Sequence, residues 1–179
     1  MIIEEYKTIC VHIPKNAGTA IETLFGNSSF KIQPDKHANI HEIKKHFPEV
    51  YKSYRKFTII RNPYDKMVSW YFYLKKNLGE HFKVLEFNEW IKNPLKFWHA
   101  DDPIRFLDSQ HTWVDDTVAL IKYENLHKEL NQFFGEEINL PVTNKSNRNH
   151  FLEYYNKNSL DTIYERYKED FEKFNYKKL

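Results

Sequence analysis

The sequence TICVHIPKNAGTAIETLFG, at residues 8–26, decides how the rest of the chain is interpreted. It begins with a continuous β-rich apolar run, which is typical of a strand covered on both faces. A short turn containing Lys15 follows, and a helix is expected from about Thr19 until Gly26 ends it. This order places several backbone N–H groups and the positive end of a helix dipole together, which is how proteins hold phosphate groups. The pattern therefore predicts an anion-binding loop.

The predicted loop differs from the usual loop that binds nucleoside triphosphates. That loop requires G-x-x-x-x-G-K-[S/T], in which the Ser or Thr holds magnesium. None of the four glycines is followed by Lys, and Lys15 instead precedes Gly18. We expect Lys15 to reach over the bound anion, Gly18 to permit close backbone approach and Thr19 to add a hydroxyl. The sequence argues against an ordinary ATPase or GTPase.

Two further β-rich runs, KFTII at 56–60 and TVALIK at 117–122, alternate with helical patterns. The expected helices cover residues 40–46, 63–76, 86–91, 125–134 and 159–174. Alternation of this kind predicts an α/β fold with a parallel sheet and helices on both sides. Ligands bind such sheets beyond the carboxyl ends of the strands, where the segments IPKNAGT, IRNPYD and Tyr123-Glu124 are expected to lie.

Composition limits the remaining possibilities. A length of 179 residues favours a single domain, 1–179, and 27 basic against 25 acidic residues exclude a broad nucleic-acid-binding surface. The one cysteine, Cys10, lies in an apolar run and is expected to be a core residue, with no disulfide or zinc site. No apolar stretch is long enough to span a membrane, and MIIEEYKT lacks the features of a signal peptide. We therefore expect a cytoplasmic protein.

The segment TIIRNPYDKMVSWYFY, at residues 58–73, predicts a second anion site. Arg61 ends a strand, and Asn62 and Pro63 have the sequence of an N-cap followed by the first helical residue. Ser69 comes six residues after Pro63, roughly 9 Å along the helix. An arginine and a hydroxyl so placed could grip one phosphate. Together the two segments predict a ligand with two separate phosphate positions.

These residues carry a resemblance to a known family. HIPKNAGTAI resembles the 5′-phosphosulfate loop of sulfotransferases that use PAPS (3′-phosphoadenosine 5′-phosphosulfate), and IRNPYDKMVSWY resembles their 3′-phosphate motif. KHANIHEIKKHFPEVYKSYRKFTIIRNPYDKMVSWY, SQHTWV, IKYENL and LPVTNKSNRNHFLEYYN are similar to the carbohydrate-type branch related to heparan sulfate 2-O-sulfotransferase and its bacterial and viral relatives. The resemblance covers nearly the whole chain. It implies a three-layer α/β/α domain with a P-loop-like core that transfers a sulfuryl group from PAPS to a hydroxyl of a glycan or small molecule, releasing PAP.

The resemblance also implies roles for particular residues. The 5′-phosphosulfate would be held by Lys15 and by the backbone of Asn16, Ala17, Gly18, Thr19 and Ala20. Arg61 and Ser69 would hold the 3′-phosphate, and Lys145, Ser146 and Arg148 match a late segment that covers the cofactor. No metal is required. A common family loop reads K-T-G-G-T-S, so at Ala20 the hydroxyl of that pattern is missing while the backbone N–H remains.

The reaction needs a base for the attacking hydroxyl, while Lys15 would stabilise charge on the bridging oxygen. His37 is preferred, because it matches a Lys-His pair of the family between the two phosphate motifs. His41 and Glu22 are alternatives, whereas His12, inside the strand, is expected to be packed.

Further residues and functions stay open. His111 and Trp113 line an acceptor cleft or belong to the core, and Tyr123-Glu124 orient the site or bond loop backbone. The competing functions are a catalytically inactive sulfotransferase-like module that binds PAP or a nucleotide, and a P-loop kinase. The sequence specifies neither the acceptor nor the oligomeric state.

Overall fold

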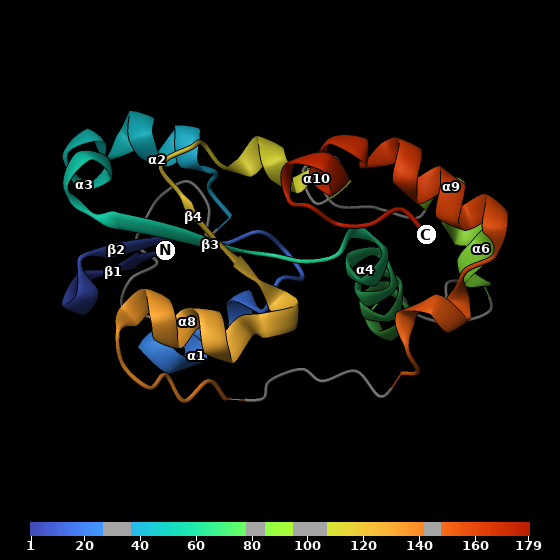
Figure 1. Ribbon diagram of the computed structural model, residues 1–179, viewed down its shortest axis with the longest axis horizontal. Coiled ribbons are helices and arrows are strands. Elements are labelled where there is room, and N and C mark those ends of the chain that lie inside the picture. Colours follow the sequence, from blue (N-terminus) through green and yellow to red (C-terminus); the bar gives the residue numbers. More distant parts are fainter. Residues whose placement is uncertain (27–36, 78–84, 95–106, 142–147) are drawn as a thin grey trace. The chain divides into compact units, whose positions relative to one another are not determined.

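A mixed four-stranded sheet has the strand order β1-β2-β3-β4 (Figure 1). The computed structural model describes residues 1–26, 37–77, 85–94, 107–141 and 148–179. Strands β2 (Thr8–Val11), β3 (Arg55–Ile60) and β4 (Ala119–Lys122) are parallel, as predicted. Strand β1 (Ile2–Ile3) pairs antiparallel with β2 and was not predicted. Two residues are too few to produce a recognisable alternation in the sequence.

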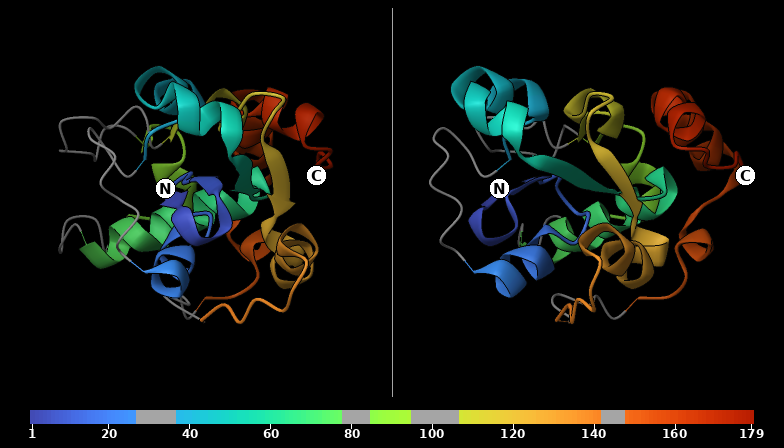
Figure 2. Two further views of the ribbon diagram at one scale, coloured as in Figure 1. Left: turned by 90° about the vertical axis from the view of Figure 1, so that its left-hand side faces the viewer. Right: turned by 60° about the vertical axis from the view of Figure 1, so that its left-hand side comes forward.

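Helices cover both faces of this sheet, which confirms the α/β fold in three layers (Figures 1 and 2). On one face lie α1 (Gly18–Phe25) and α8 (Leu126–Phe134), and on the other α2 (Ile40–His46) and α3 (Pro48–Ser53). The core beside α1 and α8 contains Cys10, Ala20, Ile21, Phe57, Ile59, Ile121 and Leu130. Burial raises the pKa of the Cys10 thiol to about 12, which confirms Cys10 as an unreactive core residue.

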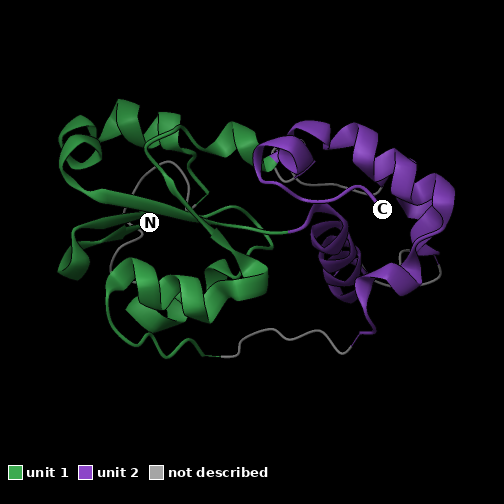
Figure 3. Ribbon diagram, viewed as in Figure 1, with its two compact units in different colours: residues 1–61, 110–145 green, residues 62–109, 146–179 purple. Residues whose placement is uncertain are grey.

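The chain divides into two compact units (Figure 3). The first contains residues 1–61 and 110–145, and the second contains residues 62–109 and 146–179. Within the second unit, aromatic and aliphatic side chains of α4 (Pro63–Asn77), α6 (Phe87–Trp90), α9 (Lys157–Arg166) and α10 (Lys168–Lys173) form one core. The 3₁₀ turn η6 (Phe151–Tyr154) adds partly buried rings to this core.

The structure confirms one predicted helix start and corrects two helix boundaries. Asn62 caps α4, since its Oδ1 accepts from the Tyr64 N–H at 3.0 Å. Pro48, expected only to stop a helix, is the first residue of α3, a position that suits proline because its missing N–H is not needed there. The helix expected over 159–174 is two helices, because Tyr167 leaves the helical conformation at φ −119° between α9 and α10.

A lysine is buried inside the second unit. Lys66, on α4, is 2% exposed, and its Nζ donates to the Asp108 carbonyl at 3.3 Å. Burial lowers the pKa of Lys66 to about 8, and the carboxylates of Asp170 and Asp108 limit the fall. The charged form of Lys66 is therefore a cost to the fold at neutral pH.

We predict that this cost disappears as pH rises. Between about pH 8 and 10 the folded chain has released the Lys66 proton, while the unfolded chain, with a lysine pKa near 10.4, retains it. Stability attributable to Lys66 then rises by up to about 1.4 kcal/mol per pH unit. Chemical denaturation of wild type and Lys66→Met at several pH values gives the free energy of unfolding of each protein. The difference between their pH slopes measures the contribution of Lys66. The raised pKa of Cys10 acts in the opposite direction but is common to both proteins. Equal pH slopes would contradict the prediction.

Candidate active site

The loop between β2 and α1 has an unusual backbone. Lys15 and Ala17 adopt left-handed conformations, with φ of 68° and 61°, although neither is glycine. Ala17 is the N-cap of α1 and provides no side-chain hydrogen bond to it. The N–H groups of the first helical residues, Gly18 and Thr19, precede any intrahelical acceptor. This helix start has the polarity that an anion requires.

Two buried amide side chains hold this loop in place. Asn16 Nδ2 donates to the Ile59 carbonyl and to Gln110 Oε1, both at 2.7 Å. Gln110 begins the 3₁₀ turn η4 (Gln110–Trp113) and bonds the backbone of Arg61 twice. Its Oε1 accepts from the Arg61 N–H at 3.0 Å, and its Nε2 donates to the Arg61 carbonyl at 2.8 Å. Gln110 thus ties the loop to the end of β3.

The structure brings Lys15 and Arg61 together. Arg61 is 5% exposed, and its guanidinium donates to the Lys15 carbonyl at 2.8 Å. The same guanidinium lies 4.0 Å from the ring centroid of Tyr123, the first residue of the 3₁₀ turn η5 (Tyr123–Asn125) after β4. These contacts confirm that the segments following three parallel strands meet at one edge of the sheet.

Thr19 and Ala20 differ in their surroundings. Thr19 is exposed at the start of α1. The Ala20 methyl group belongs to the core, and its N–H donates to the Ala17 carbonyl at 2.9 Å. A hydroxyl at position 20 would therefore lie among core side chains.

Three of the residues weighed as bases or packed histidines lie in one cluster. His37 Nδ1 is 3.2 Å from the His12 carbonyl oxygen, and the two imidazole ring centroids are 4.5 Å apart. His12 Nδ1 lies 3.3 Å from Glu22 Oε1 on α1. His12 is buried, as predicted, whereas His41 is exposed on α2.

The structure gives Gly18 a packing role that the sequence did not predict. Its φ is not positive, and a Cβ placed on it would lie 1.6 Å from His12 Nε2. The absence of a side chain at position 18 makes room for the His12 ring. The sequence motif drew attention to this glycine, but its spatial neighbour could not be predicted from local spacing.

The remaining predicted residues lie elsewhere. Trp113 is fully buried, which supports the core interpretation, and His111 is partly exposed. Ser69 is partly buried on α4 in the second unit. In the same unit Arg148 forms an ion pair of 2.5 Å with Asp65 on the first turn of α4. Lys145 and Ser146 lie outside the described residues.

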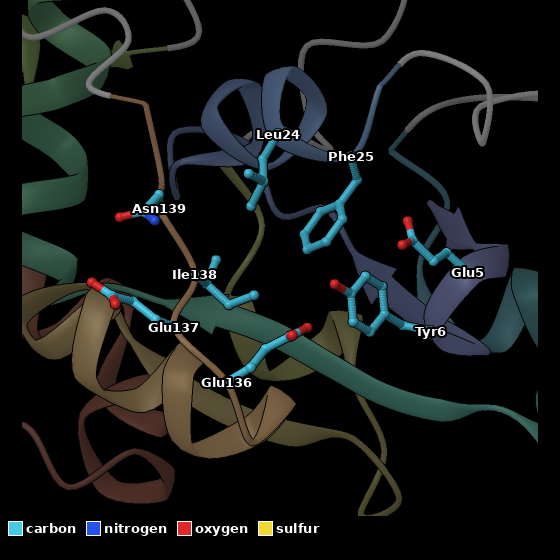
Figure 4. A pocket seen from close by; sticks show the side chains of 8 residues that line it. All are labelled: Glu5, Tyr6, Leu24, Phe25, Glu136, Glu137, Ile138 and Asn139. Carbon is cyan, nitrogen blue, oxygen red and sulfur yellow. The ribbon is translucent and has the colours of Figure 1, made fainter.

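A hollow of about 340 Å³ in the first unit is separate from these residues (Figure 4). Its lining consists of Glu5, Tyr6, Leu24, Phe25, Glu136, Glu137, Ile138 and Asn139. A hydrogen bond to Glu136 raises the pKa of Tyr6 to about 12. Three carboxylates at its rim make this hollow unsuitable for an anionic ligand.

In the described ranges no helix is both long and apolar enough to cross a membrane. The same part of the chain has no group of three or more His, Cys, Asp or Glu side chains that could hold a metal ion.

The chain matches the model of a known protein family. A family model described as "Sulfotransferase family" matches residues 1–115, which is more than half of the chain. No curated protein and no solved structure matches.

The space at Gly18 leads to a prediction about stability. We expect Gly18→Ala to displace the buried His12 ring and to destabilise the fold by about 1–3 kcal/mol. The neighbouring Ala17→Gly is the matched control, because it removes a methyl group from a left-handed residue whose strain is about 1–2 kcal/mol. Relief of this strain stabilises the fold, but the greater conformational entropy of glycine in the unfolded chain offsets part of the gain. The control should therefore change stability by less than about 1 kcal/mol. Denaturant unfolding of both variants checks this, and equal losses would contradict it.

The bonds of Gln110 lead to a second prediction. Gln110→Ala leaves the backbone N–H and carbonyl of Arg61 and the Asn16 amide without these partners, and we expect a loss of about 2–4 kcal/mol. Gln132→Ala, an exposed glutamine on α8, should change stability by less than about 0.5 kcal/mol. Thermal unfolding of the pair is the measurement. A Gln110→Ala variant as stable as Gln132→Ala would show that the bonds are dispensable.

Proposed function

Because the chain belongs to the sulfotransferase family, we propose that it transfers a sulfuryl group from PAPS to a hydroxyl acceptor. The observation that carries the proposal is the hydrogen bond from the Arg61 guanidinium to the backbone carbonyl of Lys15, which joins the two predicted anion motifs. They meet beyond the carboxyl ends of parallel strands, where α/β sheets bind ligands.

The donor would be held by residues with distinct tasks. Lys15 and the N–H groups of Gly18 and Thr19 suit the 5′-phosphosulfate, since they combine a full positive charge with the start of α1. Asn16 and Ala20 support the loop from the core, through the Asn16 amide bonds and the Ala20 methyl. PAPS supplies the sulfuryl group and departs as PAP.

Arg61 and Ser69 would hold the 3′-phosphate, as the motif they share implies. The guanidinium of Arg61 is held by its contacts with a carbonyl oxygen and an aromatic face. Arg148, together with Lys145 and Ser146, would belong to the segment that covers the donor. Arg148 would do so from its ion pair with Asp65.

His37 is the residue we assign as general base. A carbonyl oxygen can only accept, so the 3.2 Å contact requires His37 Nδ1 to carry a proton. In the neutral ring Nε2 then has the lone pair that a base needs. His37 takes the acceptor proton at Nε2, and Lys15 stabilises the negative charge on the bridging oxygen of the departing PAP. His41 and Glu22 remain the alternatives, and Glu22 already interacts with His12.

The sequence resemblance supports two finer features of the proposal, which are membership of the carbohydrate-type branch and a glycan or small-molecule acceptor. A cytoplasmic location is proposed from the composition of the chain. An inactive PAP-binding module is the alternative suggested by the hydroxyl missing at Ala20, but the core position of that methyl group weakens this argument. A P-loop kinase is disfavoured by the absence of the Gly-Lys-Ser/Thr sequence.

Ligand-induced stabilisation tests donor binding. PAP and AMP differ only in the 3′-phosphate, and we expect PAP to stabilise the chain far more than AMP or Mg-ATP. At 100 times its Kd, PAP should add about 2.7 kcal/mol, or roughly 5–10 °C in Tm. Ser69→Ala should bring the PAP response towards that of AMP, whereas Ser53→Ala, an exposed serine on α3, should not.

Ser69 is preferred to Arg61 for this test, because removing Arg61 would also release the Lys15 carbonyl. Equal stabilisation of wild type by PAP and AMP would refute the two-phosphate site. A larger response to Mg-ATP than to PAP would favour the kinase.

A further inference from the structure

His37 lies in a turn outside any described helix or strand, so its orientation depends on its contacts. Two of these involve the same residue. The His12 carbonyl accepts from His37 Nδ1, and the His12 ring packs against the His37 ring at an interplanar angle of 51°. A general base is effective only when its lone pair is held in one direction. His12 therefore contributes to the geometry of the base although it is buried.

His12 is itself held by α1. Its ring fills the space that Gly18 leaves, and its Nδ1 faces the Glu22 carboxylate at 3.3 Å. Gly18 and Glu22 are four residues apart and therefore lie on the same face of the helix. The side chains are mostly inaccessible, with 6% of His12 and 18% of Glu22 exposed, so their interaction is weakly screened by solvent.

We propose that Glu22 and His12 form a positioning pair for His37, in which Glu22 orients the His12 ring and His12 orients the base. The inference rests on the proposed function, because it concerns the base of that reaction. When His37 has accepted a proton, the Glu22 carboxylate beyond the His12 ring also stabilises the positive charge. Glu22 then acts through His12, and it is not the base itself.

The test uses Glu22→Gln, which retains the size of the side chain and removes its charge. Long-range ¹H–¹⁵N NMR of the imidazoles reports the protonated nitrogen of each ring. We expect His37 to be Nδ1-protonated in wild type, and Glu22→Gln to shift the ring nitrogens of both His12 and His37. Glu22→Asp, which retains the charge, should shift them less. Glu49→Gln, which removes an exposed charge paired with Lys52 on α3, should leave them unchanged.

PAP release from PAPS provides a second measurement. Glu22→Gln should lower kcat about 10-fold, a part of the 10²–10⁴-fold that a general base contributes, while KM for PAPS changes less than about two-fold. Unchanged His37 resonances in Glu22→Gln would overturn the positioning pair, and so would an unchanged kcat. Thermal stabilisation by PAP separates the two hypotheses. If Glu22→Gln responds to PAP as wild type does, donor binding stands whatever the fate of the pair, and if wild type does not respond, the proposed function fails.

Discussion

The bonds that Gln110 makes with Arg61 and Asn16 are the interaction on which the candidate site depends. One fully buried amide satisfies both backbone groups of Arg61 and receives the Asn16 side chain. The loop beside it contains two left-handed residues that are not glycine, each costing about 1–2 kcal/mol. Such a backbone persists only where its surroundings determine it, and here buried hydrogen bonds do so. These hydrogen bonds fix the conformation of the loop relative to the end of β3.

Arg61 adds a positive charge to this hydrogen-bond network. Its backbone is fixed by Gln110, while its guanidinium reaches the Lys15 carbonyl and the Tyr123 ring. A buried cation is costly unless it is hydrogen-bonded, and these contacts supply part of that compensation. The two predicted anion motifs are thus joined by a hydrogen bond. Substitution of Arg61 would therefore also remove the hydrogen bond that the Lys15 carbonyl accepts.

The sequence predicted what depends on local pattern. The order of strand, turn and helix and the cap at Asn62 follow from residues close together in the chain. The parallel pairing of three strands was predicted from the alternation of strands with helices. The role of Gln110 was not predicted, because the local sequence does not distinguish a buried glutamine from an exposed one. Its hydrogen-bond partners, Arg61 and Asn16, are 49 and 94 residues away in the chain. The break at Tyr167 was missed for a related reason, since the apolar spacing continues across it. Its hydroxyl bonds the Leu107 carbonyl, a contact that local spacing does not reveal.

Gly18 and Ala20 show how packing changes the meaning of a motif. A glycine in a phosphate loop suggests close approach of an anion, yet the group that approaches Gly18 is the His12 ring. A hydroxyl two residues later would lie in the core, where Ala20 packs. Both positions thus face the interior of the protein. Gly18 leaves space for the His12 ring, and Ala20 packs in the core beside the sheet. Lys15 and the first N–H groups of α1 are the parts of the loop that we propose for anion binding. Departures from the family pattern would affect an anion directly at these positions.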